Sequence, residues 1–446
     1  MAAKIAMVSL GCSKNLVDSE IMAGLLDKKS YKIIENCEDA DYIIVNTCGF
    51  IESAKEESID AILEMAEFKK TGNLKGLIAT GCLSERYHDD LMESIPELDG
   101  IIGTGNFARI AETIQEIEET GNKVMHFGNI DVEFDEDLPR NISTPAHTAY
   151  VKISEGCDNH CTYCIIPKLR GKYRSRKPEN ILNEVRTLAD NGTKEIILIA
   201  QDTTMYGYDL YGKRILHKLL EDIDLIEGLE WVRLMYAYPE NIDHKLIQTI
   251  KNSKKILHYL DIPIQHTEDK ILKRMGRRTD KRKIFDLFST LRKEIPDMII
   301  RSTMIAGFPG ESDEDHQEML RSIEELQIDK LGVFEYSREE DTPAANMDGQ
   351  IDDETKKYRQ FSAMEVQRPI SERRLSLQIG KTIDAIVEEY TEEGFSGRTW
   401  MDAPEIDGLI YVSSDIKPPI GSIVRIVITD STDFDLIGVL NDEFTK

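Results

Sequence analysis

Three closely spaced cysteines are the residues of this sequence with the clearest chemical potential. Cys157, Cys161 and Cys164 lie in the segment EGCDNHCTYCIIPKLRG, and no fourth cysteine follows nearby. A structural zinc site usually has four protein ligands, whereas a cubic iron–sulfur cluster held by three cysteines keeps one iron open to a ligand that is not protein. The triplet therefore favours a reactive iron–sulfur cluster. The alternative is a zinc knuckle completed by His160 or by a distant ligand.

Three further cysteines share a second pattern, in which an apolar run is followed by a cysteine with a glycine beside it. These pairs are Gly11 and Cys12, Cys48 and Gly49, and Gly81 and Cys82. In a parallel sheet the carboxyl ends of neighbouring strands share one edge, and glycine lets the backbone approach a bulky inorganic ligand. We therefore expect a second three-cysteine cluster. The alternative is three buried structural cysteines. Cys37 lacks the pattern and is expected to be a bystander.

The sequence around this second pattern predicts a parallel α/β domain. Apolar runs at 4–10, 41–47 and 75–80 have the length of strands, and 51–70 has apolar residues three and four apart, which is typical of a helix. Alternation of strands and helices indicates a parallel sheet with helices on its faces. The polar, acidic stretch 128–147 predicts a linker that leaves this domain.

A second strand–helix series begins near Tyr150 and includes the cysteine triplet. Its six candidate strands lie at 149–154, 194–200, 231–238, 258–264, 298–308 and 330–337. Six such units suit an incomplete α/β barrel, whose active-site groups lie at the carboxyl ends of the strands. The triplet follows the first of these strands, where a barrel carries its chemistry.

The last part of the chain has a different pattern of apolar and polar residues. A long charged helix at 352–377 leads to short alternating strands with Gly and Pro turns. This pattern predicts a small all-β barrel of about 70 residues. The predicted fold class is therefore α/β, with a parallel α/β domain, a partial barrel and a terminal β-barrel.

The composition limits the classes of protein. The 446 residues suit two or three domains, and the odd number of 7 cysteines fits a reducing compartment better than a disulfide framework. We find neither a signal peptide nor an apolar stretch near the ~20 residues that span a bilayer, so we expect a cytoplasmic protein without a membrane partner. The net charge of −27 is expected to repel nucleic acid and to favour basic partners. The alternative is that this charge serves solubility alone.

The motif C-x-x-x-C-x-x-C of the triplet is that of radical S-adenosylmethionine (SAM) enzymes. From about residue 4 to 440 the chain resembles the methylthiotransferases among them, in architecture and in all six patterned cysteines. GCSKNLVDSE and GRTWMDAPEIDG look like the branch that modifies a ribosomal protein. The tRNA-modifying branch usually has Gln-Met-Asn after the first cysteine, where this chain has Ser13, Lys14 and Asn15.

The resemblance implies a domain organisation. It implies an amino-terminal methylthiotransferase domain at 1–125, a linker at 126–148, a partial (β/α)6 radical SAM barrel at 149–374 and an all-β TRAM barrel at 375–446. It also implies two 4Fe–4S clusters, one on Cys157, Cys161 and Cys164, and one on Cys12, Cys48 and Cys82.

The resemblance further implies the chemistry. The open iron of the barrel cluster would chelate SAM, and one electron from flavodoxin or ferredoxin would yield a 5′-deoxyadenosyl radical, which needs a closed, water-poor site. The second cluster would carry the sulfur, which accepts a methyl group from another SAM. The product would be a C–S–CH₃ group on the β-carbon of an aspartate. The substrate would be the basic small-subunit ribosomal protein twelve, free or in the assembled subunit.

Other candidates for binding SAM lie in the triplet loop or near strand ends. They are Tyr163, Gln201, Asp202, Gln265 and Arg301. We expect Tyr163 beside the adenine and Arg301 paired with the SAM carboxylate. Polar residues at strand ends are also common as helix caps or loop anchors, and that alternative stays open here.

The charge of the terminal barrel bears on the substrate. Residues 375–446 contain five Lys and Arg against fourteen Asp and Glu, a net charge of −9. Such a barrel repels phosphate and attracts a basic polypeptide, so nucleic acid is not the preferred substrate. Asp402, Glu405 and Asp407 in the loop DAPEID are the candidate substrate contacts. Two alternatives remain: a tRNA adenosine methylthiotransferase, and a metal-stabilised scaffold that binds a ribosomal protein without catalysis.

Overall fold

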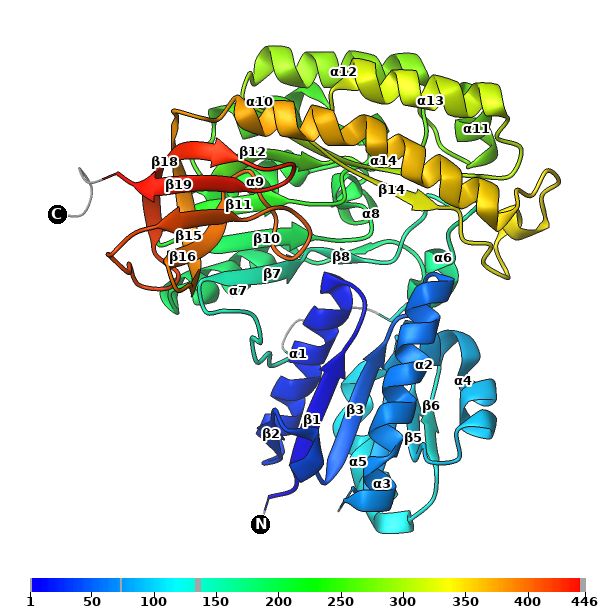
Figure 1. Ribbon diagram of the computed structural model, residues 1–446. Coiled ribbons are helices and arrows are strands. Elements are labelled where there is room, and N and C mark those ends of the chain that lie inside the picture. Colours follow the sequence, from blue (N-terminus) through cyan, green and yellow to red (C-terminus); the bar gives the residue numbers. More distant parts are fainter. Residues whose placement is uncertain (1, 73, 133–137, 442–446) are drawn as a thin grey trace. The chain divides into compact units, whose positions relative to one another are not determined.

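The computed structural model describes residues 2–72, 74–132 and 138–441, so positions 133–137 of the predicted linker lie outside the described residues. The chain forms two compact units, and Figure 1 labels their elements where there is room. The first comprises Met1–Ser143, Lys152–Arg176 and Ser337–Asn346, and the second comprises Thr144–Val151, Lys177–Tyr336 and Met347–Lys446. The segment 149–374, predicted as one barrel, is thus divided between the two units. Both cysteine sets belong to the first unit.

The first unit contains a six-stranded parallel sheet in the order β2-β1-β3-β4-β5-β6. Its strands are β1 (Lys4–Ser9), β2 (Lys32–Ile34), β3 (Tyr42–Thr47), β4 (Gly76–Gly81), β5 (Gly100–Ile102) and β6 (Val124–His126). The predicted parallel sheet is confirmed. Strands β2, β5 and β6 have three residues each, which is too short for a sequence pattern to show them.

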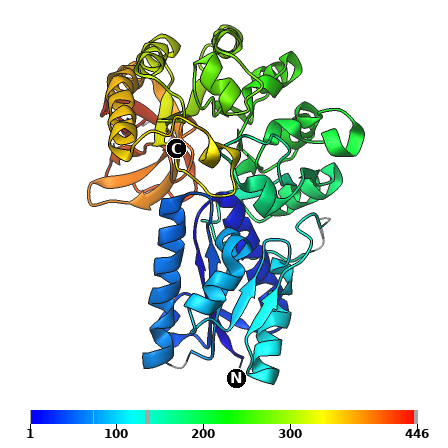
Figure 2. The same cartoon turned by 90° about the vertical axis from the view of Figure 1, so that its right-hand side faces the viewer.

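Helices cover both faces of this sheet, as the blue and cyan ribbons of Figure 2 show. They are α1 (Ser13–Lys28), α2 (Glu52–Ala66), α3 (Phe68–Thr71), α4 (Cys82–Ser94) and α5 (Ile110–Thr120). On one face Ile62 of α2 and Leu91 of α4 pack with Ile43 of β3. On the other, Met22 of α1 packs with Ile44. Successive strand residues are therefore buried on opposite faces, which explains the unbroken apolar runs.

The remaining part of the first unit carries the cysteine triplet. It contains the short antiparallel pair β8 (Ser154–Glu155) and β9 (Arg174–Ser175), and the helix α6 (Ile166–Arg170). Three short 3₁₀ segments also belong to the first unit: Cys37–Asp39, Phe107–Arg109 and Pro343–Asn346.

The second unit contains an open six-stranded sheet in the order β14-β13-β12-β11-β10-β7. Its strands are β7 (Thr148–Lys152), β10 (Glu195–Ile199), β11 (Trp231–Leu234), β12 (Ile256–Asp261), β13 (Ile299–Ala306) and β14 (Lys330–Glu335). Strands β10 to β14 pair in parallel and in chain order, as expected for a partial barrel. Each predicted strand is present, with shifted ends.

Helices connect these strands. They are α7 (Pro178–Asp190), α8 (Tyr208–Tyr211), α9 (Leu216–Asp224), α10 (His244–Asn252), α11 (Asp269–Arg274), α12 (Lys281–Glu294), α13 (Asp313–Leu326) and α14 (Asp353–Ser376). Polar N-caps start several of them: the side chains of Asp243, Asp280 and Ser312 accept backbone N–H groups of α10, α12 and α13. No described helix is long and apolar enough to cross a membrane.

The terminal part forms a closed five-stranded barrel in the order β15-β16-β17-β19-β18. Its strands are β15 (Thr382–Tyr390), β16 (Gly394–Thr399), β17 (Ile410–Ser413), β18 (Ile423–Ser431) and β19 (Leu436–Leu440). Buried and exposed residues alternate along β17. The predicted small β-barrel is confirmed.

Buried ion pairs attach this barrel to the ends at which strands of the open sheet begin. Arg398 Nη2 lies 2.6 Å from a carboxylate oxygen of Glu195, the first residue of β10. Asp402 Oδ1 lies 2.6 Å from Nζ of Lys330, the first residue of β14. The terminal barrel therefore packs opposite the carboxyl ends of the strands, which are the ends that carry the site in α/β barrels.

Candidate functional site

The three amino-terminal cysteines follow three neighbouring strands of the first unit. Cys12 lies three residues after β1, whereas Cys48 directly follows β3 and Cys82 directly follows β4. Because these strands are adjacent and parallel, their carboxyl ends meet at one edge of the sheet. The fold thus places side by side the three loops that share the cysteine–glycine pattern, while their role as metal ligands stays a prediction.

Two of the accompanying glycines allow the cysteine loops to touch. A Cβ atom on Gly11 would lie 2.7 Å from Cβ of Cys48 and 3.0 Å from its Sγ. A Cβ atom on Gly49 would lie 2.8 Å from the backbone of Leu83, next to Cys82. A side chain at either position would displace the neighbouring loop. We expected the glycines to make room for a ligand, but their closest neighbours are the adjacent cysteine loops.

Burial dominates the acid–base properties of these thiols. Cys48 and Cys82 are buried, and Cys12 is exposed. Burial, with the nearby Cys82 thiol, raises the pKa of Cys48 to about 12. Burial also raises the pKa of Cys82, while Arg170 acts in the opposite direction. Since metals bind thiolates, metal binding here must release protons, and a positive charge beside Cys82 favours that exchange.

The donor set fits an iron–sulfur cluster by its chemistry and its neighbourhood. Three thiols on adjacent loops influence one another electrostatically, and thiolate is the ligand that such clusters take. Among the described residues, no three His, Cys, Asp or Glu side chains converge closely enough to form a finished metal site. The fit therefore rests on the neighbourhood of the loops and not on coordination geometry.

Cys157, Cys161 and Cys164 lie in a compact loop between β8 and α6. The Cys164 amide donates to the Cys161 carbonyl at 3.0 Å, and the Cys157 amide donates to the Gly171 carbonyl at 3.1 Å. Burial raises the pKa of Cys164 above its ordinary value, and the Cys161 thiol adds to the shift. Backbone hydrogen bonds thus fix the loop, and the local environment disfavours a free thiolate.

Two other residues of this loop, His160 and Tyr163, differ in how far they are exposed to solvent. His160 is exposed and has a left-handed backbone with φ of +49°. Its position gives no support to the zinc-knuckle alternative. Tyr163, a predicted SAM contact, is half-buried between the last two cysteines of the triplet. Its contact with an adenine stays a prediction.

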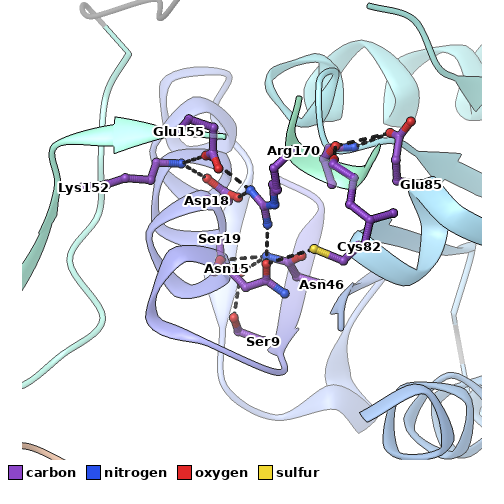
Figure 3. Close-up of polar contacts among 12 residues, drawn as sticks. Ser9, Asn15, Asp18, Ser19, Asn46, Cys82, Glu85, Lys152, Glu155 and Arg170 are labelled. Carbon is purple, nitrogen blue, oxygen red and sulfur yellow. Dashed lines mark hydrogen bonds and ion pairs between the residues drawn. The ribbon is translucent and has the colours of Figure 1, made fainter. Parts of the chain in front are cut away.

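A buried ion-pair network joins the triplet segment to α1 (Figure 3). Arg170 Nη1 lies 2.6 Å from Asp18 Oδ2, and Lys152 Nζ lies 2.5 Å from Asp18 Oδ1 and 2.6 Å from Glu155. Burial opposes the charged form of Arg170, but Cys82, Asp18 and Glu155 raise its pKa above the ordinary value. This network contains two cations and two carboxylates, all of them buried.

The first residue of α4 packs directly against the helix that follows the triplet. Cys82 shares a small core with Ile165 and Leu169, and Phe50 packs against it. The Thr104 hydroxyl donates to the Leu169 carbonyl at 2.5 Å. Within the first unit, therefore, α6 is the element that lies beside both cysteine sets.

Glu339 is a further buried charge that no sequence pattern singles out. Its carboxylate lies 2.8 Å from Arg86 Nη1 and 3.1 Å from Lys55 Nζ. Arg86, on the helix begun by Cys82, also donates to the carbonyl of Gly49 at 3.0 Å. Glu339 thus fixes the helices behind two cysteine loops. The contact spans 253 residues, so the sequence gives no signal for it.

Three of the four predicted SAM contacts of the second unit, Gln201, Asp202 and Gln265, lie after strand ends, whereas Arg301 is the third residue of β13. Asp202 is fully buried and caps a short helix by accepting the Thr204 amide at 3.0 Å, so the helix-cap alternative describes it. Gln201 precedes it and is half-buried. Gln265 follows β12 with a left-handed φ of +71°, and Tyr236 follows β11 with φ of +58°. Non-glycine residues in this region are strained and often mark functional sites. No pattern in the sequence indicates Tyr236.

Arg301 is engaged inside the protein. Its Nη1 lies 2.7 Å from Asp261, and its Nε lies 3.6 Å from Asp407 of the terminal barrel. Burial opposes the charge of Arg301, but Asp261 outweighs it and its pKa is raised. These two carboxylates give the Arg301 guanidinium partners inside the protein, and its expected pairing with a SAM carboxylate stays a prediction.

The expectation that the DAPEID loop presents exposed carboxylates is wrong for two of its three residues. Asp402 is 3% exposed and pairs with Lys330. The Asp407 carboxylate accepts the Tyr259 hydroxyl at 2.7 Å and is likewise buried. Only Glu405 of these three is exposed. Burial of a carboxylate depends on distant partners, which the local sequence does not reveal.

Comparison with protein families divides the chain in three. Residues 151–323 match the radical SAM superfamily, residues 4–103 match the uncharacterized protein family UPF0004, and residues 379–440 match the TRAM domain. The triplet Cys157, Cys161 and Cys164 lies in the radical SAM match, and Cys12, Cys48 and Cys82 lie in the UPF0004 match.

Three relatives carry the same name, ribosomal protein uS12 methylthiotransferase RimO. The one from Clostridioides difficile is 52% identical over 436 residues, which is 98% of each chain. One from Clostridium botulinum is 49% identical over 99% of each chain. One from Thermoanaerobacter is 49% identical over 97% of this chain and 99% of its own.

Solved structures with a similar fold are far more distant in sequence. TsrM from Kitasatospora setae, a radical SAM methyltransferase with cobalamin and a [4Fe-4S] cluster bound, has a TM-score of 0.58 at 12% identity and covers 77% of each chain. OxsB, a cobalamin-dependent radical enzyme with SAM bound, has a TM-score of 0.51 at 13% identity and covers 83% of this chain and 56% of its own. At these identities the likeness shows the fold alone.

Proposed function

This chain belongs to the RimO family of radical SAM methylthiotransferases, and from that premise we propose that it attaches a methylthio group to the β-carbon of an aspartate in ribosomal protein uS12. The observation that carries the proposal is the presence of two separate three-cysteine sets in one compact unit. One set suffices for cleavage of SAM, whereas a reaction that also transfers sulfur is expected to use a second thiol-bound site.

The residues of each set would hold one 4Fe–4S cluster. Cys157, Cys161 and Cys164 would hold the first, and Cys12, Cys48 and Cys82 the second. When bound, these clusters supply the electron for cleavage of SAM and an open iron for the sulfur donor. Flavodoxin or ferredoxin would be the source of that electron.

The chain's own residues prepare the second site. Burial of Cys48 and Cys82 keeps water from two of the three thiols. Arg170 places a positive charge beside Cys82, which favours the thiolate form needed for metal binding. Glu339 holds Arg86 and thereby the loop that contains Gly49.

SAM itself would bind at the carboxyl ends of the strands of the second unit. Gln201 and Gln265 lie shortly after such ends, and Gln265 has a left-handed backbone of the kind that is often found at functional sites. One SAM molecule would supply the methyl group and a second the 5′-deoxyadenosyl radical. This requirement for two SAM molecules is part of the proposal.

The charge of the terminal barrel supports a basic protein substrate. A ribosomal protein that contacts RNA carries a basic surface, because it must neutralise phosphate. Glu392 and Glu393, at the turn between β15 and β16, are exposed, as is Asp415. The Ser414 amide donates to the Glu393 carbonyl at 3.1 Å, so the backbone places these three residues on adjoining turns. They replace the DAPEID loop as candidate contacts.

Anaerobic reconstitution followed by a two-substrate assay tests the proposal. The reconstituted chain is given SAM, sulfide and dithionite together with either purified uS12 or unmodified tRNA, and the products are analysed by mass spectrometry. We expect one methylthio group on an aspartate of uS12, with 5′-deoxyadenosine and S-adenosylhomocysteine both formed. Modification of the tRNA alone would overturn the assignment of uS12 as the substrate. A colourless, iron-free protein would indicate a scaffold that binds a ribosomal protein without catalysis.

A further inference from the structure

Asn15 is a buried side chain that contacts the loops of all three amino-terminal cysteines. Its Nδ2 atom donates to the carbonyl of Leu10 at 3.0 Å and to that of Thr47 at 2.9 Å, just before Cys12 and Cys48. Its Oδ1 atom accepts from Arg170 and lies 3.9 Å from Sγ of Cys82. One carboxamide, 0% exposed, therefore sets the separation of three loops that lie far apart in the sequence.

Asn15 is itself held in place from the sheet. The side-chain Nδ2 atom of Asn46, on β3, donates to the backbone carbonyl of Asn15 at 2.8 Å and to the Ser19 hydroxyl at 2.9 Å. Asn46 is buried as well. Figure 3 shows this chain of contacts from Ser9 and Ser19 through Asn46 and Asn15 to Arg170 and Cys82. The start of α1 is thus fixed to the strand that precedes Cys48.

Arg170 reaches this carboxamide from the other cysteine segment. It lies six residues after Cys164, at the end of α6, and its side chain is 3% exposed. Its Nη1 atom binds Asp18 at 2.6 Å, and its Nη2 atom binds Asn15. The guanidinium is consequently a fixed, buried cation between Asp18 and Cys82.

The buried charges around Arg170 show why its positive charge would matter once a metal is bound to the cysteines. Arg170 and Lys152 balance Asp18 and Glu155, so the network is neutral while the thiols are protonated. Each thiolate formed on metal binding adds one negative charge, and reduction of a bound cluster adds another. In a buried region such charge is expensive unless a cation lies close by, and Arg170 is the cation next to Cys82.

We propose that Asn15 and Arg170 are positioning residues of the amino-terminal cysteine site: Asn15 sets the spacing of the three cysteine loops, and Arg170 stabilises the negative charge that a bound and reduced cluster brings. This inference rests on the proposed function only in assigning a cluster to Cys12, Cys48 and Cys82. It predicts two separable effects, because loop spacing governs occupancy by iron and charge governs the reduction potential.

The test uses the full-length chain with Cys157, Cys161 and Cys164 replaced by alanine, so that only the amino-terminal site can be reconstituted. Into this parent we introduce Asn15→Asp, Arg170→Gln and Arg170→Lys. Arg140→Gln is the matched control, because Arg140 also forms a buried ion pair with a carboxylate of α1, Glu20, at 2.5 Å. Iron per chain and the midpoint potential, from a redox titration followed by electron paramagnetic resonance, are measured for each.

Asn15→Asp replaces the donor Nδ2 by an oxygen that faces two carbonyls, so we expect iron per chain to fall by more than half. Arg170→Gln should make reduction at least about tenfold less favourable, which is about 59 mV for one electron. Arg170→Lys should keep the potential of the parent. Arg140→Gln should change neither quantity.

The outcomes separate the inference from the proposed function. A parent that binds no iron overturns the assignment of the cluster and the inference with it. A parent that binds iron, with full iron in Asn15→Asp or an unchanged potential in Arg170→Gln, overturns the inference alone. A role that is merely structural would lower iron in Arg170→Gln without moving the potential of the loaded fraction. If Arg170→Gln does not fold, full iron in Asn15→Asp still overturns the inference.

Discussion

Lys330 and Asp402 form a buried ion pair that links the open sheet of the second unit to its terminal barrel. Their Nζ and Oδ1 atoms lie 2.6 Å apart, and Thr399 donates its hydroxyl to the other carboxylate oxygen at 2.5 Å. Burial opposes the charge of Lys330, but Asp402 and Asp407 raise its pKa above the ordinary value. The pair is therefore a structural connection, made by a carboxylate that the sequence suggested for substrate binding.

Replacement of Asp402 by Asn should lower stability more than substrate affinity. The change leaves the Lys330 ammonium buried without its partner, and breaking a buried pair in this way costs about 3–5 kcal/mol. The apparent midpoint of thermal unfolding should fall clearly, as measured by circular dichroism on the full chain. Asp415→Asn, at an exposed position, is the control and should leave the midpoint within error. Equal midpoints for both variants would contradict the structural role of Asp402.

The stability of the second unit should depend on pH through Glu195. Burial favours the neutral acid, but Arg398 and Arg233 outweigh it and hold the pKa of Glu195 below its ordinary value. The unfolded chain, where Glu has a pKa of about 4.3, then takes up the proton first as the pH falls. The contribution of Glu195 is complete at neutral pH and is lost as the pH falls through its folded-state pKa.

Glu195→Gln isolates this contribution. At pH 7 the variant should be less stable by about 3–5 kcal/mol, because two buried guanidinium groups lose their shared carboxylate. Below about pH 4 the difference from the wild type should shrink, since the unfolded wild type then binds a proton that folded Glu195 does not, and it should be smallest once Glu195 is protonated in the folded state as well. Urea unfolding curves at several pH values measure the difference. A gap that stays constant down to pH 3 would contradict the assignment.

The positions of the cysteines could be predicted because they follow from strand order alone. Apolar runs indicate β1, β3 and β4, and parallel neighbours end at one edge, so Cys48 and Cys82 had to lie near each other. The partners of buried charges could not be predicted in this way. Arg170 binds Asp18 across 152 positions, and a periodic pattern carries no information about such a contact. The same holds for Asp407, whose burial depends on Tyr259.

Cys161→Ala should abolish cleavage of SAM. A cubic cluster held by two thiolates lacks the ligand that fixes it in the loop, so SAM loses its binding iron. Release of 5′-deoxyadenosine by the reconstituted variant with dithionite, measured by chromatography, should fall to the level seen without protein. Cys37→Ala is the control, because Cys37 starts a short 3₁₀ segment and packs against the core of the first unit. Undiminished release by Cys161→Ala would show that the barrel cluster is wrongly assigned.

Replacement of Cys12, Cys48 and Cys82 together by alanine should separate the two chemical steps. The triplet loop keeps its own backbone hydrogen bonds, so cleavage of SAM should persist within about a factor of three. Methylthiolation of uS12 should stop, since the thiol-bound site for sulfur is absent. Iron per chain should fall by about half in the same preparation, as expected if each set holds one cubic cluster. Retained methylthiolation would mean that these three cysteines are only structural.

Capture of a basic substrate should depend on the exposed carboxylates at the β15–β16 turn. Glu392→Gln, Glu393→Gln and Asp415→Asn together remove three negative charges from exposed positions. Because exposed charges act mainly on association, the apparent affinity for uS12 should fall by on the order of tenfold at low salt, with little change in the maximal rate. The difference should vanish at high salt, since the screening length falls from ~10 Å at 0.1 M to ~3 Å at 1 M.

The matched control, Asp286→Asn with Glu324→Gln and Glu325→Gln, removes the same charge from exposed helix positions of the same unit and should have a smaller effect. Saturation curves of methylthiolation against uS12 concentration measure both. Identical curves for the two triple variants would remove the turn from recognition and leave only the net charge of the chain as the attraction.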